Sequence, residues 1–155
     1  MSLIKEWKFG THSARWEAPD LLRLTWRGPT RVEDVDSVLA IFQEVAADKP
    51  IFVISDVSQS TIDKAAREHF SQSLRAEWFH GLIYVGANAL QRAITKAIVI
   101  ALYFTGKWRV DIEFADTELE AYQLISRIRR ARGVEAPQRG EAAGPLGLEE
   151  PQALA

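Results

Sequence analysis

Residues 51–63 read IFVISDVSQSTID, and the change of composition inside this stretch decides the fold. The first four residues form a short apolar run with turn signals on both sides, which is typical of a strand covered on both faces. Six of the next nine residues are Ser, Thr or Asp, the residues that favour turns and helix caps. We therefore expect a buried central strand, then a polar loop, then a helix.

The flanking segments predict the remaining strands. HSARWEA (12–18) and LLRLTWRG (21–28) alternate apolar and polar residues on either side of a turn, which predicts a hairpin with one solvent-exposed face. KEWKF (5–9) is a candidate strand before this hairpin. GLIYVG (81–86) predicts a second central strand, and WRVDIEF (108–114) alternates as an edge strand does.

Four helices are predicted between and after these strands, over about residues 30–49, 63–79, 89–105 and 117–132. Their expected N-terminal caps are, in chain order, Thr30 with Glu33, Ser60 or Thr61, Asn88, and Thr117 with Glu120. The predicted order is β-β-α-β-α-β-α-β-α. Strands that alternate with helices indicate an α/β fold with a mixed, mostly parallel sheet and helices packed against it.

Composition narrows the class of protein. The chain has 155 residues, 47% of them hydrophobic, which is enough for one domain with a real core. The net charge of -2 gives no reason to expect nucleic acid as a partner. The sequence has no cysteine, which excludes disulfides and thiolate metal sites. We expect a cytoplasmic protein, because neither a signal peptide nor a membrane-spanning run is visible. We also expect neither a cofactor nor a metal ion.

The last part of the chain differs from the rest. Residues 134–155 contain four Glu, one Arg, three Pro and no aromatic residue. Such a segment cannot bury enough apolar surface to offset its chain entropy. We expect a domain over residues 1–133 and a disordered, acidic, Pro/Gly-rich tail over 134–155.

The polar loop after the central strand is the first candidate site. In open α/β sheets, ligands bind beyond the carboxyl ends of the strands, where this loop is expected. The candidate binding or switch residues are Asp56, Ser58, Ser60, Thr61 and Asp63. The alternative is local geometry alone, because Ser and Asp side chains commonly bond to nearby backbone amides.

The predicted helix over 89–105 is the second candidate. Residues 98–104 are all apolar, so this half of the helix is apolar almost all round. Three interpretations stay open: burial under the last helix, a homodimer face, or one wall of a hydrophobic pocket. The candidate interface or wall residues are Arg92, Lys96, Ile98, Leu102 and Phe104, of which the two cations could also hold an anionic head group.

Other motifs point to no chemistry. The three histidines have no metal-ligand spacing, and neither a G-x-S-x-G elbow nor a phosphate-binding glycine motif is present. Four arginines in RIRRAR (127–132) are interpreted as a solvated helix end that suits the helix dipole, although they could touch phosphate or an acidic surface.

Four segments, in order, carry a resemblance to a known fold over about residues 10 to 128: HSARWEAPDLLRLTWRG, FVISDVSQ, GANALQRAITKAI and FADTELEAYQLI. They resemble the STAS fold of sulfate transporters and anti-sigma-factor antagonists. Within it they look like the SpoIIAA-like branch of small bacterial proteins, which is also compared with CRAL-TRIO lipid-transfer domains. In the antagonists, a kinase phosphorylates the first Ser of an Asp-Ser-Ser-Gly-like stretch, and Lys64 stands at that position here.

The resemblance implies a function as well as a fold. The favoured hypothesis is a non-enzymatic regulatory or protein-interaction module without the usual phosphorylatable serine. It would bind a protein partner, or a second copy of itself, through the loop and the second and third helices. The alternative is a carrier or sensor of a small hydrophobic or amphipathic, lipid-like molecule. A hydrolase is a third hypothesis, which would need a histidine beside Ser58 or Ser60.

Overall fold

The computed structural model describes residues 4–104 and 110–135, which build one six-stranded sheet with the strand order β1-β2-β3-β4-β5-β6. The strands are β1 (Ile4–Phe9), β2 (His12–Glu17), β3 (Leu21–Thr30), β4 (Ile51–Ile62), β5 (Phe79–Val85) and β6 (Asp111–Ala115). The pairs β1–β2 and β2–β3 are antiparallel, and the other three are parallel. The predicted mixed, mostly parallel sheet is confirmed, and KEWKF lies within the edge strand β1.

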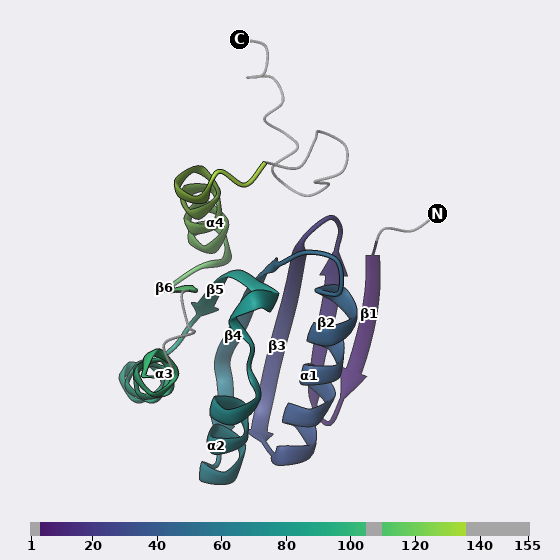
Figure 1. Cartoon of the computed structure of the whole chain (residues 1–155). Helices are drawn as coiled ribbons and strands as arrows, with labels where there is room; N and C mark the ends of the chain where they lie inside the picture. Colours follow the sequence, from purple (N-terminus) through teal and green to yellow (C-terminus); the bar gives the residue numbers. More distant parts are fainter. Residues whose placement is uncertain (1–3, 105–109, 136–155) are drawn as a thin grey trace.

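The helices divide unequally between the two faces of this sheet. They are α1 (Val32–Val45), α2 (Lys64–Ser73), α3 (Ala89–Tyr103) and α4 (Glu118–Arg132), with a 3₁₀ turn over Ala76–Trp78. Residues of α1, α2 and α3 belong to one core cluster, and residues of α4 to the other. Figure 1 shows α3 and α4 on opposite sides of β6. The sheet is therefore the middle layer of three.

The central strand joins these two cores. Residues 51–55 of β4 are all buried, as the apolar run predicted. Val53 points into the cluster shared with α1, whereas Phe52 and Ile54 point into the cluster beneath α4. Alternate side chains of a strand point to opposite faces, so a run without polar breaks suits a strand with helices on both sides.

β4 is longer than its composition suggested. A register shift between Thr25 and Arg27 interrupts its pairing with β3, and pairing then resumes from Gln59 to Ile62. The predicted loop is therefore the second half of a strand, and the prediction that Ser60 or Thr61 caps the next helix is wrong. Asp63 is the cap, with its Oδ1 accepting a hydrogen bond from the Ala66 amide at 2.8 Å.

Two other helix boundaries differ from the prediction. Thr30 is the buried last residue of β3, so the predicted box with Glu33 does not form. Instead the Arg31 amide donates to Asp34 Oδ2 at 2.9 Å, one residue further along. The second helix ends at Ser73 rather than Phe79, because Leu74 is extended and the chain turns back to start β5.

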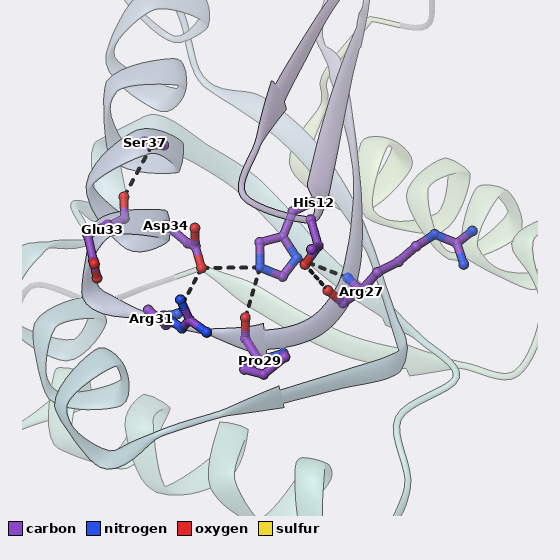
Figure 2. Close-up of polar contacts among 8 residues, drawn as sticks. His12, Arg27, Pro29, Arg31, Glu33, Asp34 and Ser37 are labelled. Carbon is purple, nitrogen blue, oxygen red and sulfur yellow. Dashed lines mark hydrogen bonds and ion pairs between the residues drawn. The ribbon is translucent and has the colours of Figure 1, made fainter.

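A buried histidine fixes the turn from β3 into α1 (Figure 2). The Arg27 amide donates to His12 Nδ1 at 2.9 Å. His12 Nε2 therefore carries the proton, and it lies 3.2 Å from the Pro29 carbonyl oxygen and 3.3 Å from Asp34 Oδ2. Both ring nitrogens are thus occupied in holding backbone and helix together, which is a structural role.

The other two caps agree with the sequence. Asn88 caps α3 and Thr117 caps α4, each accepting from the amide three residues on. Val134, just past α4, still packs against the core, whereas the predicted tail falls outside the described residues from 136 onward. In the described part of the chain no helix is long and apolar enough to cross a membrane.

Candidate ligand-binding site

The strands β4 and β5 end at different positions along the sheet, and the candidate site lies next to this difference. β5 ends at Val85 opposite Asp56, while β4 runs on for six more residues, along which β3 is its only partner among the described strands. The free edge of β4 binds the N-terminus of α3. Gln91 Nε2 donates to the carbonyl oxygens of Val57 and Ser60, at 2.7 and 2.9 Å.

The polar residues predicted for this region divide into two groups. Asp56 Oδ1 accepts from both the amide and the hydroxyl of Ser58, at 3.0 and 2.7 Å, which is local turn chemistry. Ser60 and Thr61 instead line a cavity. Asp63 is the helix cap described above, and Lys64 is the exposed first residue of α2.

This cavity, of about 220 Å³, lies between the sheet, α2 and α3. Its apolar lining is Leu24, Trp26, Phe42, Val53, Val57, Ile62, Phe70, Leu74, Phe79, Leu82, Leu90, Ile94, Ile98, Val99, Leu102 and Ile112. Its polar lining is Thr30, Ser55, Ser60, Thr61, Tyr84, Asn88, Gln91 and Thr95. Leu90 is 69% exposed, so the cavity reaches the surface beside the start of α3.

Two hydroxyls on the sheet wall of the cavity are next to each other. Ser55 on β4 and Tyr84 on β5 are register partners, so both side chains stand on the same face of adjacent strands. Burial raises the pKa of Tyr84 to about 12, so the phenol keeps its proton at neutral pH. Sequence patterns did not point to either residue, because each occupies an ordinary position in a predicted strand.

The predicted wall residues of α3 also divide. Ile98 and Leu102 line the cavity, together with Ser60 and Thr61 of β4, so the structure brings part of both predicted sets together. Phe104 is 87% exposed on the outside. Burial of this helix under the last one is wrong, because α4 covers the other face of the sheet.

The two cations of α3 lie outside the cavity. Arg92 Nε donates to the Ala87 carbonyl oxygen at 3.1 Å, and its guanidinium stacks on Phe114 and lies 3.6 Å from Asp116. Lys96 is exposed. Neither cation lines the cavity, so the described part of the cavity wall offers an anionic head group no positive charge.

The arginine-rich end of α4 is not wholly solvated as predicted. Arg129 is buried and makes a two-pronged ion pair with Asp20, at 2.9 and 2.7 Å, while stacking on Phe52. Bidentate pairs of this kind have fixed geometry. Arg129 thus ties the last helix to the turn between β2 and β3.

No histidine in the described residues makes a hydrogen bond to Ser58 or Ser60, the contact that the hydrolase hypothesis required. His69 instead lies between Asp36, at 2.6 Å, and Ser73, at 3.5 Å. That group sits at the C-terminal end of α2, where helix carbonyls lack partners. Carbonyl oxygens repel an oxyanion rather than stabilise it, so the free carbonyls of this helix end would not serve as an oxyanion hole.

Comparison with known proteins gives information on the fold. No family model matches the chain, and no curated protein matches it. Among solved structures, a crystal structure of an uncharacterized protein from the DUF3478 family, from Shewanella loihica PV-4, is described as having a SpoIIAA-like fold. It matches with a TM-score of 0.52 over 78% of this chain and 90% of that one, at 15% identity. The chain has a SpoIIAA-like fold. At this identity the SpoIIAA-like match speaks for the architecture alone.

Proposed function

We propose that this SpoIIAA-like protein is a non-enzymatic binding module that holds a small hydrophobic or amphipathic molecule between the sheet and helices α2 and α3, as a carrier or sensor. The cavity of about 220 Å³ is the observation that carries this proposal. Protein interiors are normally packed without voids larger than a water molecule. A mostly apolar void with a few hydroxyls on its wall is what small-molecule sites have in common.

The size of the cavity limits the occupant. An apolar cavity of about 150 Å³ in another protein takes up benzene, so this one has room for roughly ten non-hydrogen atoms. A single ring with a short substituent or a short branched chain fits, whereas a long-chain lipid would have to leave part of its chain outside, past Leu90.

Mass spectrometry of the freshly purified full chain, under native and then denaturing conditions, tests this function. A small mass held natively and lost on denaturation is the expected result. Ile98→Trp fills the cavity and should abolish the extra mass. Ile100→Trp is the matched control, since Ile100 is 56% exposed on the same helix. If both variants keep the mass, the molecule binds elsewhere and the proposal fails.

A second candidate function, self-association as an interaction module, has one observation in its favour. Ile100 and Tyr103 of α3 and its C-cap residue Phe104 expose 56%, 54% and 87% of their surface. Grouped exposed apolar side chains are typical of protein-binding surfaces. Sedimentation velocity over a range of concentrations should show a dimer that Phe104→Ser dissociates. A monomer at every concentration would count against this candidate.

A further inference from the structure

Ser55 and Tyr84 line the cavity, and in the described part of the chain their hydroxyls have no hydrogen-bond partner. Ser55 is 6% exposed, and both residues line the cavity from neighbouring positions of β4 and β5. Within residues 4–104 and 110–135, neither hydroxyl makes a hydrogen bond to the protein. Buried hydroxyls in proteins almost always have a partner, so this pair calls for an explanation.

The surroundings limit what could satisfy these hydroxyls. Across the cavity α3 presents mostly apolar side chains, among them Ile98 and Leu102. Its polar lining residues, such as Thr95, make no hydrogen bond to either hydroxyl within the described residues. The Tyr84 phenol is a donor at neutral pH, as any protonated tyrosine is, and burial extends this into alkaline solution by raising its pKa to about 12. Ser55 supplies a second donor at the adjacent register position. Two donors at adjacent positions on a mostly apolar wall favour an oxygen acceptor on the occupant.

Charge sets the second limit. Among the described residues no Asp, Glu, Lys, Arg or His lines the cavity. An ion inside it would lose its hydration and find no counter-charge, which is far more costly than burying a neutral polar group. A carboxylate, a phosphate or an amine is therefore disfavoured at the Ser55–Tyr84 end.

We propose that the cavity selects a small neutral molecule whose carbonyl or hydroxyl oxygen accepts hydrogen bonds from Tyr84 and Ser55, while its apolar part lies against Ile98 and Leu102. This inference rests on the proposed binding function and names the class of ligand: neutral, mostly apolar and oxygen-bearing. The recognition is directional, since the oxygen must face the sheet and the hydrocarbon must face α3.

Acetophenone and cumene are suitable probes, because both have nine non-hydrogen atoms and a similar size, and they differ in a carbonyl against a CH-methyl group. Each would be titrated into the full chain and followed by amide NMR shifts of β4, β5 and α3. For each protein, the ratio of the two dissociation constants is measured. The change of this ratio between proteins is the informative quantity, because the different hydration of the two probes cancels in it.

Tyr84→Phe and Ser55→Ala should each weaken acetophenone relative to cumene by roughly fivefold, the effect of one modest hydrogen bond. Tyr103→Phe is the matched control for the tyrosine, since Tyr103 is 54% exposed and outside the cavity. It should leave the ratio unchanged, and cumene should bind all four proteins alike.

The failures of the inference and of the underlying function are distinguishable. If both probes bind and shift cavity residues, but neither Tyr84→Phe nor Ser55→Ala changes the ratio, the cavity binds by shape alone and the oxygen-selective site is overturned. If neither probe shifts the amides around the cavity in the wild-type chain, the proposed function itself fails. Benzoate, the anionic analogue, should bind at least tenfold more weakly than acetophenone. Equal binding of the two would contradict a neutral ligand.

Discussion

At the scale of single residues, a few polar groups lie in the interior, and they differ in whether they have hydrogen-bond partners. Asp20 and Arg129 satisfy each other through two hydrogen bonds across 109 residues of sequence. His12 is fully occupied by backbone and carboxylate groups. The Tyr84 hydroxyl has no such arrangement in the described chain. The first two therefore stabilise the fold, whereas the third is available for binding.

Removing one member of the buried ion pair should be costly. Asp20→Ala leaves the Arg129 guanidinium buried and unpaired, so we expect the free energy of unfolding to fall by about 3–5 kcal/mol. Adding Arg129→Met should recover part of that loss, as urea denaturation of both single variants and the double variant would show. Arg127→Met is the control, because its pair with Glu113 is 3.9 Å long and exposed, and it should cost about 1 kcal/mol or less. Additive single variants would contradict a coupled pair.

Tyr84 should make the fold sensitive to alkali. An unfolded tyrosine loses its proton near pH 10, whereas Tyr84 keeps it to about pH 12. Between these values the unfolded chain binds fewer protons, so stability falls as pH rises, by about 2–3 kcal/mol in total. The free energy of unfolding, measured by denaturation at pH 9 and at pH 11, should therefore fall less between these two pH values in Tyr84→Phe than in wild type. The same pH dependence in both proteins would show that Tyr84 is not titrating as a buried phenol.

At the scale of elements, one side chain joins α3 to the sheet. The second half of β4 has a free edge because β5 stops at Val85, and Gln91 binds two carbonyl oxygens on that edge. The same side chain accepts from the Asn88 amide at 2.8 Å, which completes the helix cap. Few residues of α3 are buried, so apolar contacts hold this helix less firmly than they hold most helices. The Gln91 hydrogen bonds therefore contribute a larger share of its attachment to the sheet.

The anchor can be tested apart from the cap. Gln91→Glu keeps an acceptor for the Asn88 amide but cannot donate to Val57 and Ser60. We expect it to destabilise the protein by about 2 kcal/mol, at least as much as Gln91→Ala, with faster hydrogen exchange across α3. Asn88→Ala removes the side-chain cap alone and should cost about 1 kcal/mol. If Gln91→Glu behaves like wild type, the cap rather than the anchor holds α3.

At the scale of the whole molecule, the cavity belongs to one face of the sheet. The face that carries three helices encloses about 220 Å³, and no described residue of the cluster under α4 lines this space. Gln91 bonds α3 to β4 near the N-terminus of the helix, and further along the same helix Ile98, Val99 and Leu102 line the cavity. Stability and binding therefore compete on the same face.

Filling that space should stabilise the empty protein. Val53→Ile adds one methylene from the floor of the cavity, so we expect a gain of about 0.8 kcal/mol in the free energy of unfolding and weaker ligand binding. Val38→Ile is the matched control: Val38 is fully buried but outside the cavity, and overpacking there should cost about 1–3 kcal/mol. Loss of stability in both variants, measured by urea denaturation, would contradict a void beside Val53.

The sequence predicted the sheet, the helices and the fold, because these depend on local patterns such as the apolar run at 51–54 and the caps at Asn88 and Thr117. It did not predict the continuation of β4 through Ser58 and Ser60, since Ser and Thr suit both loops and strands and only pairing with β3 decides. A minor part of the candidate site was anticipated, in Ser60, Thr61, Ile98 and Leu102. Ser55 and Tyr84 were not, because a void depends on how far apart distant elements are held.

The void also has a mechanical consequence. Hydrostatic pressure favours whichever state occupies less volume, and the empty space inside a folded protein disappears when the chain unfolds. The ligand-free molecule should therefore unfold at moderate pressure, with the side of α2 and α3 yielding more readily than the side of α4. A molecule bound against Ser55 and Tyr84 would fill the cavity and so raise the pressure at which the protein unfolds.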